Sequence, residues 1–294
     1  MNVPLEFGIS ITPNWLEQRQ VLGLAEVADQ AGLDLIGIQD HPYQWRFYDT
    51  WTLIAYLAGR TSRVRFFPDV ANLPLRPPAV LAKSAASLDV LTSGRVELGL
   101  GAGGFWDAIE AMGGPRRSPG QAVDATEEAI DVIRLIWSGE RGVRYEGRHY
   151  QLSGVHTGPK PAHDIGIWLG AGGPRMLDLI GRKADGWVPS AGWMPPEGLP
   201  EHLRRIEDAA AKAGRDPAGI RRVYNIGGVI GPVTGEPFVG PASYWVDEIG
   251  RLAEMGMDAF IFWPGGENPI AQAESFATEV ASVVRGGAVA EERS

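Results

Sequence analysis

Side chains that can carry chemistry follow two short apolar runs in the first quarter of the chain. Gln39-Asp40-His41-Pro42 comes directly after LDLIGI (33–38), and Pro68-Asp69-Val70-Ala71-Asn72 comes directly after RVRFF (63–67). A histidine has an unperturbed pKa near 6.5, so it can hold or release a proton around neutral pH. We therefore take His41 as the first candidate catalytic residue.

Two glycine-rich stretches are candidates for holding a cofactor. Gly99-Leu100-Gly101-Ala102-Gly103-Gly104 has the spacing of a dinucleotide fingerprint, with Asp124 twenty residues beyond it. We reject this interpretation, because that fingerprint belongs to the first strand–helix turn of its sheet and this stretch follows the fourth predicted strand. Close backbone packing is the alternative. The stretch Gly170-Ala171-Gly172-Gly173-Pro174-Arg175 opens a helix, and it predicts either an anion cradle of backbone N–H groups and Arg175 or only a tight turn.

The elements that position these residues alternate strictly. Strand-like runs are predicted at 5–11, 33–38, 63–67, 95–101, 165–171, 185–190, 221–230 and 258–263. Helical-period runs lie near 15–31, 48–60, 77–91, 121–137, 174–183, 198–213, 241–255 and 269–285, and 142–152 resembles a hairpin. Eight such repeats predict an α/β fold, a single (β/α)8 TIM barrel over 1–286. We expect small insertions after the fourth and fifth strand regions and a flexible C-terminal tail over 287–294.

A barrel of this kind builds its active site from the loops after the strands, which is where the candidate residues fall. The composition excludes several other functions. A net charge of −9 argues against nucleic acid or an acidic membrane as partner, and the absence of cysteine excludes thiolate chemistry and suits the cytoplasm. The five histidines have no ligand spacing, so no metal site is predicted, and a small-molecule substrate remains.

The order of several motifs resembles the luciferase-like flavin and deazaflavin oxidoreductase family over nearly the whole chain. The matching segments are Asp40-His41 with Trp45, Asp69-Val70 before Pro77-Pro78, SGRVELGLGAG (93–103) and WLGAGGPRMLDLIGRKADGW (168–187). The resemblance implies a TIM barrel, a homodimer, and FMN or coenzyme F(420) bound at the strand C-termini. An Asp-His pair is similar to the deazaflavin-dependent branch, whereas the FMN enzymes more often have Glu-His.

The resemblance also implies roles for individual residues. Asp40 is expected near the pyrimidine edge of the cofactor, and a non-proline cis peptide at Asp69-Val70 is expected behind its ring. The expected cofactor-binding residues are Asp40, Asp69, Val70, Asn72, Gly101, Gly103, Gly170, Ala171, Gly172, Gly173 and Arg175. Trp45, Trp106 and Trp193 are expected to shape a flat aromatic substrate pocket.

By the same resemblance, Gly104 falls at the position where sugar-phosphate dehydrogenases of this branch carry a catalytic glutamate. The departure argues against glucose 6-phosphate as substrate, and it leaves His41 and Asp107 as the nearby proton carriers. Asp107 needs burial to act as an acid, since an unperturbed aspartate has a pKa near 3.9, and it is equally suited to cap a helix.

The predicted function is hydride transfer between coenzyme F(420) and a small organic substrate. One alternative is an FMN-dependent luciferase-like monooxygenase. Another is a catalytically inactive flavin-binding or structural homologue, which the missing glutamate leaves open. The second and third predicted helices carry more apolar and small residues than exposed helices need, so they are the expected homodimer contact.

Overall fold

The computed structural model describes residues 4–233 and 235–291, and nine of its strands form a parallel sheet that closes into a barrel. The strand order is β3-β2-β1-β12-β10-β9-β8-β5-β4. The two ends of this path, β3 (Arg65–Pro68) and β4 (Ala71–Asn72), are separated in the chain only by Asp69 and Val70. They share one place in the ring, so nine strands make eight positions. The predicted TIM barrel is confirmed.

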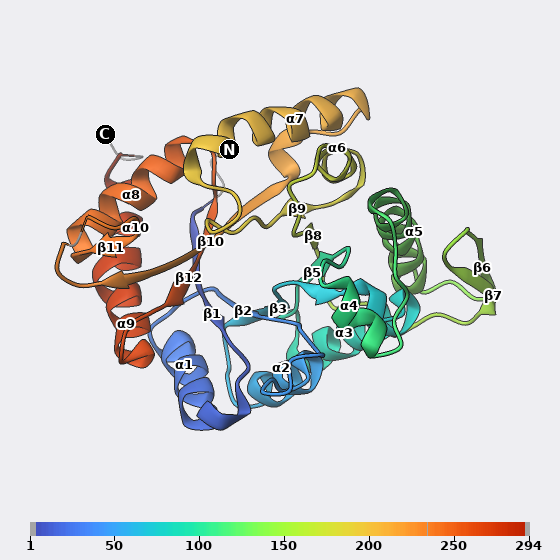
Figure 1. Cartoon of the computed structure of the whole chain (residues 1–294), viewed down its shortest axis with the longest axis horizontal. Helices are drawn as coiled ribbons and strands as arrows, with labels where there is room; N and C mark the ends of the chain where they lie inside the picture. The colour runs from blue at the N-terminus through green and yellow to red at the C-terminus, as the bar shows by residue number, and fades with distance from the viewer. Residues whose placement is uncertain (1–3, 234, 292–294) are drawn as a thin grey trace.

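The other elements follow the predicted alternation closely (Figure 1). The remaining ring strands are β1 (Glu6–Ile11), β2 (Leu35–Ile38), β5 (Leu98–Gly101), β8 (Ile167–Leu169), β9 (Gly186–Trp187), β10 (Arg221–Ile230) and β12 (Ala259–Pro264), and β11 (Val239–Gly240) pairs with β10. The helices are α1 (Gln18–Gln30), α2 (Thr50–Ala58), α3 (Pro78–Thr92), α4 (Trp106–Ala111), α5 (Pro119–Trp137), α6 (Pro174–Lys183), α7 (Leu199–Lys212), α8 (Ala242–Glu254), α9 (Pro269–Ser275) and α10 (Ser282–Glu291), with short helical turns η1 (Trp15–Glu17), η2 (Leu73–Leu75), η3 (Pro196–Gly198), η4 (Pro217–Gly219) and η5 (Phe276–Ala281).

Two separate apolar clusters explain why the strands are buried on both faces. The larger cluster joins strands to the surrounding helices and holds Phe7, Ile9 and Ile11 of β1. The smaller one comes from several ring strands and fills the barrel itself, with Leu35, Phe67, Trp168, Val188, Val223, Ala259 and Ile261. Because successive side chains of a strand point to opposite faces, a continuous apolar run supplies both clusters. Val70 packs against the smaller cluster.

The predicted hairpin is present, and two other predicted boundaries differ from the structure. The hairpin of β6 (Val143–Glu146) and β7 (Gln151–Val155) lies outside the ring before the fifth ring strand, at the right edge of Figure 1. The sequence places a second insertion after the fifth strand, but residues 170–173 lead directly into α6, and the extra segment, 188–198, follows the sixth strand, β9. The last helix continues to Glu291 instead of ending at Arg285, and 292–294 lie outside the described residues.

Ion pairs close the end of the barrel where the strands begin. Arg65 at the start of β3 pairs with Glu6 of β1 and with Glu97, at 2.7 Å from the latter. His163 lies beside them, with Nδ1 2.9 Å from Asp89 Oδ1 and Nε2 3.5 Å from Glu97 Oε1. These interactions with Glu97 and Asp89 raise the pKa of His163 to about 9.

Within the described residues no helix is long and apolar enough to cross a membrane.

Candidate functional site

The loops at the C-terminal ends of the strands bring the predicted residues of the first two motifs together. Asp40 follows β2, and one of its oxygens accepts the backbone N–H of Asn72 at 2.8 Å. The same oxygen accepts Nε of Arg76 at 2.6 Å, and the other accepts Nη2 of Arg76, also at 2.6 Å. Asp40 is buried, and these partners satisfy both of its carboxylate oxygens. The Asp40 carboxylate therefore locks the loop after β2 to the segment that enters α3.

The peptide bond between Asp69 and Val70 is cis, as the resemblance implies. Glycines on the two neighbouring strands surround Val70. A Cβ atom at Gly101 would lie 2.7 Å from a Val70 methyl, and one at Gly170 would lie 3.1 Å from both methyls. Real Cβ contacts are longer than 2.7 Å, so a side chain at Gly101 would displace Val70, and one at Gly170 would be tightly packed against it. Val70 and its glycines form a smooth wall at the barrel mouth, which we call the Val70 wall.

A polar group lies beside this wall. Asp69 is partly buried and accepts a hydrogen bond from Nδ2 of Asn225 at 3.0 Å, and the same nitrogen lies 3.2 Å from the Ser190 hydroxyl. Burial raises the pKa of Asp69 to about 7, against a smaller lowering by Asn225. The side-chain oxygens of Asn225 and Asn72 are buried without a hydrogen-bond partner among the described residues. Native proteins rarely leave such acceptors unpaired, so this mouth fits a ligand that carries hydrogen-bond donors.

His41 lies in an aromatic cluster made of His41, Tyr43, Phe47 and Phe105. Its Nδ1 is 2.8 Å from the Tyr43 hydroxyl, and its ring packs edge to face with Phe105 at 5.7 Å. Phe105 belongs to the segment after β5, so the contact joins the β2 and β5 loops. Burial lowers the pKa of His41, and the neighbouring Asp40 raises it by less. The ring is therefore neutral at pH 7.

The structure does not give Asp107 the burial that an acid needs. Its side chain is 97% exposed and is paired with Arg116. Arg117 is also engaged, through the Tyr150 hydroxyl at 3.0 Å. Nothing lies within 4 Å of a Cβ built on Gly104, so the missing glutamate leaves open space.

The three predicted tryptophans have different surroundings. Trp45 and Trp193 are exposed, by 68% and 86% of their surface. The ring of Trp45 contacts Trp15 at 6.4 Å. Trp106 is half-buried and packs on Gly103, whose φ of +96° suits glycine. None of the three contacts a ring of the aromatic cluster in the described part of the chain.

The second glycine stretch leads into α6 as predicted. Gly173 caps the helix, and a Cβ there would meet open space within 4 Å, whereas one at Gly172 would lie 3.1 Å from the Met194 side chain. Ala171 is fixed by its carbonyl, which accepts Nε1 of Trp187 at 2.7 Å. Arg175 extends toward α5 and pairs with Asp124 at 2.8 Å. We call residues 170–175 the glycine cradle.

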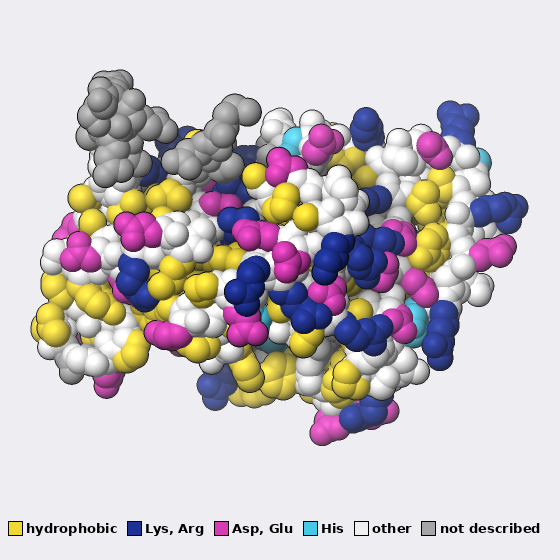
Figure 2. Space-filling view, turned by 90° about the horizontal axis from the view of Figure 1, so that it is seen from above, with side chains coloured by type: hydrophobic (Ala, Val, Ile, Leu, Met, Phe, Trp, Pro, Cys, Tyr) yellow, Lys and Arg dark blue, Asp and Glu magenta, His cyan; other side chains and the backbone are white. Residues whose placement is uncertain are grey.

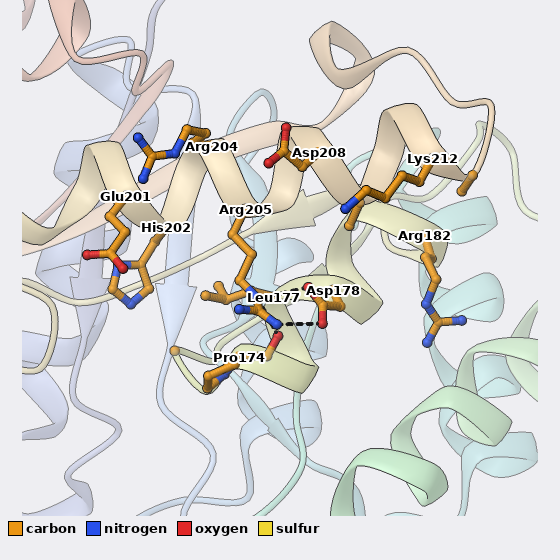
Figure 3. A pocket seen from close by; sticks show the side chains of 13 residues that line it. Pro174, Leu177, Asp178, Arg182, Glu201, His202, Arg204, Arg205, Asp208 and Lys212 are labelled. Atoms are coloured by element: carbon orange, nitrogen blue, oxygen red, sulfur yellow. Dashed lines mark hydrogen bonds and ion pairs between the residues drawn. The ribbon is translucent and has the colours of Figure 1, made fainter.

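A groove of about 650 Å³ between α6 and α7 adjoins the cradle at Gly172 (Figure 3). Arg205 of α7 crosses it to Asp178 at 2.7 Å and donates to the Pro174 carbonyl at 3.0 Å. Both basic and acidic side chains line the groove. Figure 2 shows the two kinds intermixed over one face of the molecule. An anion at the cradle thus depends on the loop backbone and Arg175 more than on a general positive field.

The sequence did not single out several residues that build the mouth. Arg76, Tyr43 and Asn225 contact predicted residues, and Ser190 contacts Asn225. Asn225 had a signal, since it is an amide in the middle of the apolar strand RRVYNIGGVI. Arg76 had no such signal, because its pairing with Asp40 depends on the three-dimensional path of the chain.

In the described residues no group of three or more His, Asp or Glu side chains is arranged to hold a metal ion.

A parallel barrel with its polar groups at the strand C-termini is an architecture shared by many enzymes. This chain belongs to the luciferase-like monooxygenase family, whose model matches residues 6–232. It is 29% identical over 221 residues to an F(420)-dependent glucose-6-phosphate dehydrogenase of Microbacterium testaceum, covering 73% of this chain and 65% of that protein. It is 33% identical over 213 residues to a 5,10-methylenetetrahydromethanopterin reductase of Methanolobus tindarius, covering 72% and 62%.

The chain thus spans about two thirds or less of the length of these two relatives. Among solved structures, an F(420)-dependent secondary alcohol dehydrogenase in complex with an F(420)-acetone adduct has the same fold. The TM-score is 0.85 at 19% identity, over 96% of this chain and 99% of that one.

Proposed function

We propose that this chain is an oxidoreductase that binds coenzyme F(420) at the barrel mouth and transfers a hydride between it and a small organic substrate. The observation that carries the proposal is the juxtaposition of the Val70 wall, the unpaired Asn72 and Asn225 oxygens, and the neutral His41. The curated relatives with F(420)-dependent activities support the choice of cofactor.

The residues present fit a flat, polar-edged ring. The Val70 wall supports a ring from one side without side chains from Gly101 or Gly170 in the way. Asn72 and Asn225 offer acceptors to donors on the edge of the ring. The glycine cradle offers backbone N–H groups, the positive end of α6 and Arg175 to a phosphate.

When bound, the deazaflavin supplies the hydride chemistry, and the protein orients the reactants, excludes water and stabilises charge. Asp40 holds the loop that carries His41, through Arg76 and Asn72. His41 lies in the aromatic cluster, where its neutral ring can hydrogen-bond to a substrate atom. Asp69 keeps a pKa of about 7 beside the Val70 wall, so a proton can be held there near neutral pH.

The aromatic cluster and the empty space at Gly104 favour an uncharged or weakly polar substrate. A sugar phosphate brings two negative charges, and the glutamate expected in sugar-phosphate dehydrogenases is absent at Gly104. Phe105 and Tyr43 instead offer apolar surface beside His41.

The proposal is tested by titrating the purified chain with oxidised coenzyme F(420) and, separately, with FMN. Ten tryptophans provide fluorescence that a bound ring quenches, and Trp168 lies in the barrel cluster against which Val70 packs. We expect coenzyme F(420) to bind with a Kd in the micromolar range or tighter, about −8 kcal/mol, and FMN to bind more weakly.

The two titrations separate the alternatives. Tighter binding of FMN contradicts the proposal and supports an FMN-dependent monooxygenase. Quenching by neither compound indicates a homologue that has lost its cofactor. A deazaflavin that lacks the phosphate serves as a control, since binding that does not depend on the phosphate leaves the glycine cradle without a function.

A further inference from the structure

One polar neighbour dominates the surroundings of His41, and it is a tyrosine two residues further along the same loop. Nδ1 of His41 lies 2.8 Å from the Tyr43 hydroxyl. Phe105 packs against both rings, at 5.7 Å from His41 and 5.9 Å from Tyr43, and Phe47 contacts His41 at 6.3 Å. The cluster therefore fixes the orientation of both rings and keeps this hydrogen bond in place.

The hydrogen bonds of the surrounding groups decide whether Tyr43 or His41 donates the proton of the bond between them. Both oxygens of Asp40, the adjacent carboxylate, are occupied by Arg76 and Asn72. Across the described residues, the Tyr43 hydroxyl has no second hydrogen-bond partner, and Nε2 of His41 has none at all. A phenol O–H with one available acceptor donates its proton to that acceptor. Nδ1 of His41 is therefore unprotonated and accepts the hydrogen bond from Tyr43.

The charges around the pair agree with this assignment. Burial lowers the pKa of His41 more than the neighbouring Asp40 raises it, so the imidazole is neutral at pH 7. Burial and then Asp40 raise the pKa of Tyr43 to about 12, so the phenol keeps its proton. Arg76 is the nearby cation, and Asp40 and Asp49 engage its guanidinium.

We propose that Tyr43 is a positioning residue that holds His41 in the tautomer with its proton on Nε2. His41 then offers a substrate a neutral N–H donor instead of a base, a consequence that rests on the proposed function. Such a donor stabilises negative charge that develops on an acceptor atom. The favoured substrates are therefore those reduced at a carbon bonded to such an atom, as in a carbonyl group, and the alcohol-oxidising direction lacks a ready base at this position.

The tautomer can be measured without any cofactor. Two-bond proton–nitrogen NMR correlation of protein labelled with ¹⁵N-histidine distinguishes a protonated from an unprotonated ring nitrogen, and His41→Gln assigns the signal. We expect a protonated Nε2 and an unprotonated Nδ1. Tyr43→Phe keeps the ring and removes the hydroxyl, so the Nδ1 signal should move and the pKa of His41 should rise, because a hydrogen bond to the neutral form is lost. A protonated Nδ1 at pH 7, or an unchanged His41 in Tyr43→Phe, overturns the inference.

A matched variant separates this effect from a general loss of structure. Tyr145→Phe also removes a tyrosine hydroxyl, one that bonds Asp131 near the hairpin at 3.4 Å, and should leave the His41 signals unchanged. The signals of the other four histidines report whether Tyr43→Phe remains folded. If His41 carries its proton on Nε2 but the chain does not bind F(420), only the proposed function is refuted. If the chain binds F(420) but His41 carries its proton on Nδ1, only this inference is refuted.

Discussion

Asp40 and His41 are neighbours in sequence, yet the structure gives them different tasks. Asp40 is buried, and its carboxylate oxygens accept hydrogen bonds from Arg76 and Asn72, so it positions a loop. His41 keeps one ring nitrogen without a protein partner in the described residues. The sequence indicates the importance of the pair but not this division, because it depends on an arginine 36 residues away.

Replacing His41 tests its catalytic role directly. We expect His41→Gln to keep cofactor affinity nearly intact and to lower turnover by about 10²–10³, because a flexible amide that neither Tyr43 nor the ring packing holds in place no longer aims its N–H at the developing charge. Asp107→Asn should turn over normally, because that side chain is 97% exposed and paired with Arg116. Steady-state kcat and the fluorescence Kd of both variants provide the comparison. An inactive Asp107→Asn beside a normal His41→Gln reverses the two roles.

A second histidine should make stability depend on pH. Glu97 and Asp89 raise the pKa of His163 from 6.5 to about 9 in the folded chain. A raised folded pKa means that the contribution to stability is fully present below pH 6.5 and is lost as the pH rises through 9. The Tm difference between wild type and His163→Gln should therefore be largest near pH 6 and shrink toward pH 10.

The control for this titration is His156→Gln. His156 is exposed, and among the described residues its ring accepts only the backbone N–H of Gly142 and pairs with no carboxylate, so its replacement should shift Tm by only a small amount. A difference for His163→Gln that stays constant from pH 6 to 10 would mean that the ion pairs beneath the barrel do not act on folding.

At the scale of elements, hydrophobic periodicity predicts the number and order of strands and helices, because each ring strand is buried on both sides and each helix on one. It does not predict that one strand is split. β3 and β4 are separated at Asp69-Val70, where the chain turns aside to form the wall, and the resemblance supplied that position. Helix ends are also weakly encoded, since the small residues after Arg285 are compatible with a helix and with a tail.

The glycine cradle yields a prediction at this scale. Gly172→Val places a branched side chain near the flexible Met194 side chain, which can give way, so the fold should persist while close approach of an anion is blocked. Arg175→Ala removes a charge-assisted contact of roughly 1.5–3 kcal/mol and should weaken F(420) binding about 10-fold or more. Arg141→Ala, an exposed arginine before the hairpin, is the matched control. Unchanged Kd values in both cradle variants would place the phosphate elsewhere.

In the whole molecule the two ends of the barrel have separate tasks. Ion pairs among Glu6, Arg65 and Glu97 close the end where strands begin, and the loops at the other end hold the candidate site. Stability and chemistry are therefore placed where substitutions in one need not disturb the other. The outer helices remain, and α2 and α3 are adjacent there and carry apolar residues that the barrel does not bury (Figure 1).

We predict that α2 and α3 join two copies of this chain into a homodimer. Val80 and Leu91 are 64% and 82% exposed and lie eleven residues apart on α3, which is three helical turns, so they share one face. Tyr56 of the adjacent α2 is also exposed, by 52%. A lone chain gains nothing by exposing such a face, whereas a two-fold axis would cover it with its own copy.

Light scattering at micromolar concentration should give twice 31.7 kDa for the wild type. Val80→Asp with Leu91→Asp should give 31.7 kDa, because each copy would then bury charge against the other, and Val283→Asp on α10 should remain a dimer. A wild-type mass of one chain would refute the dimer, and a dimer that survives the α3 substitutions would place its contact on another face.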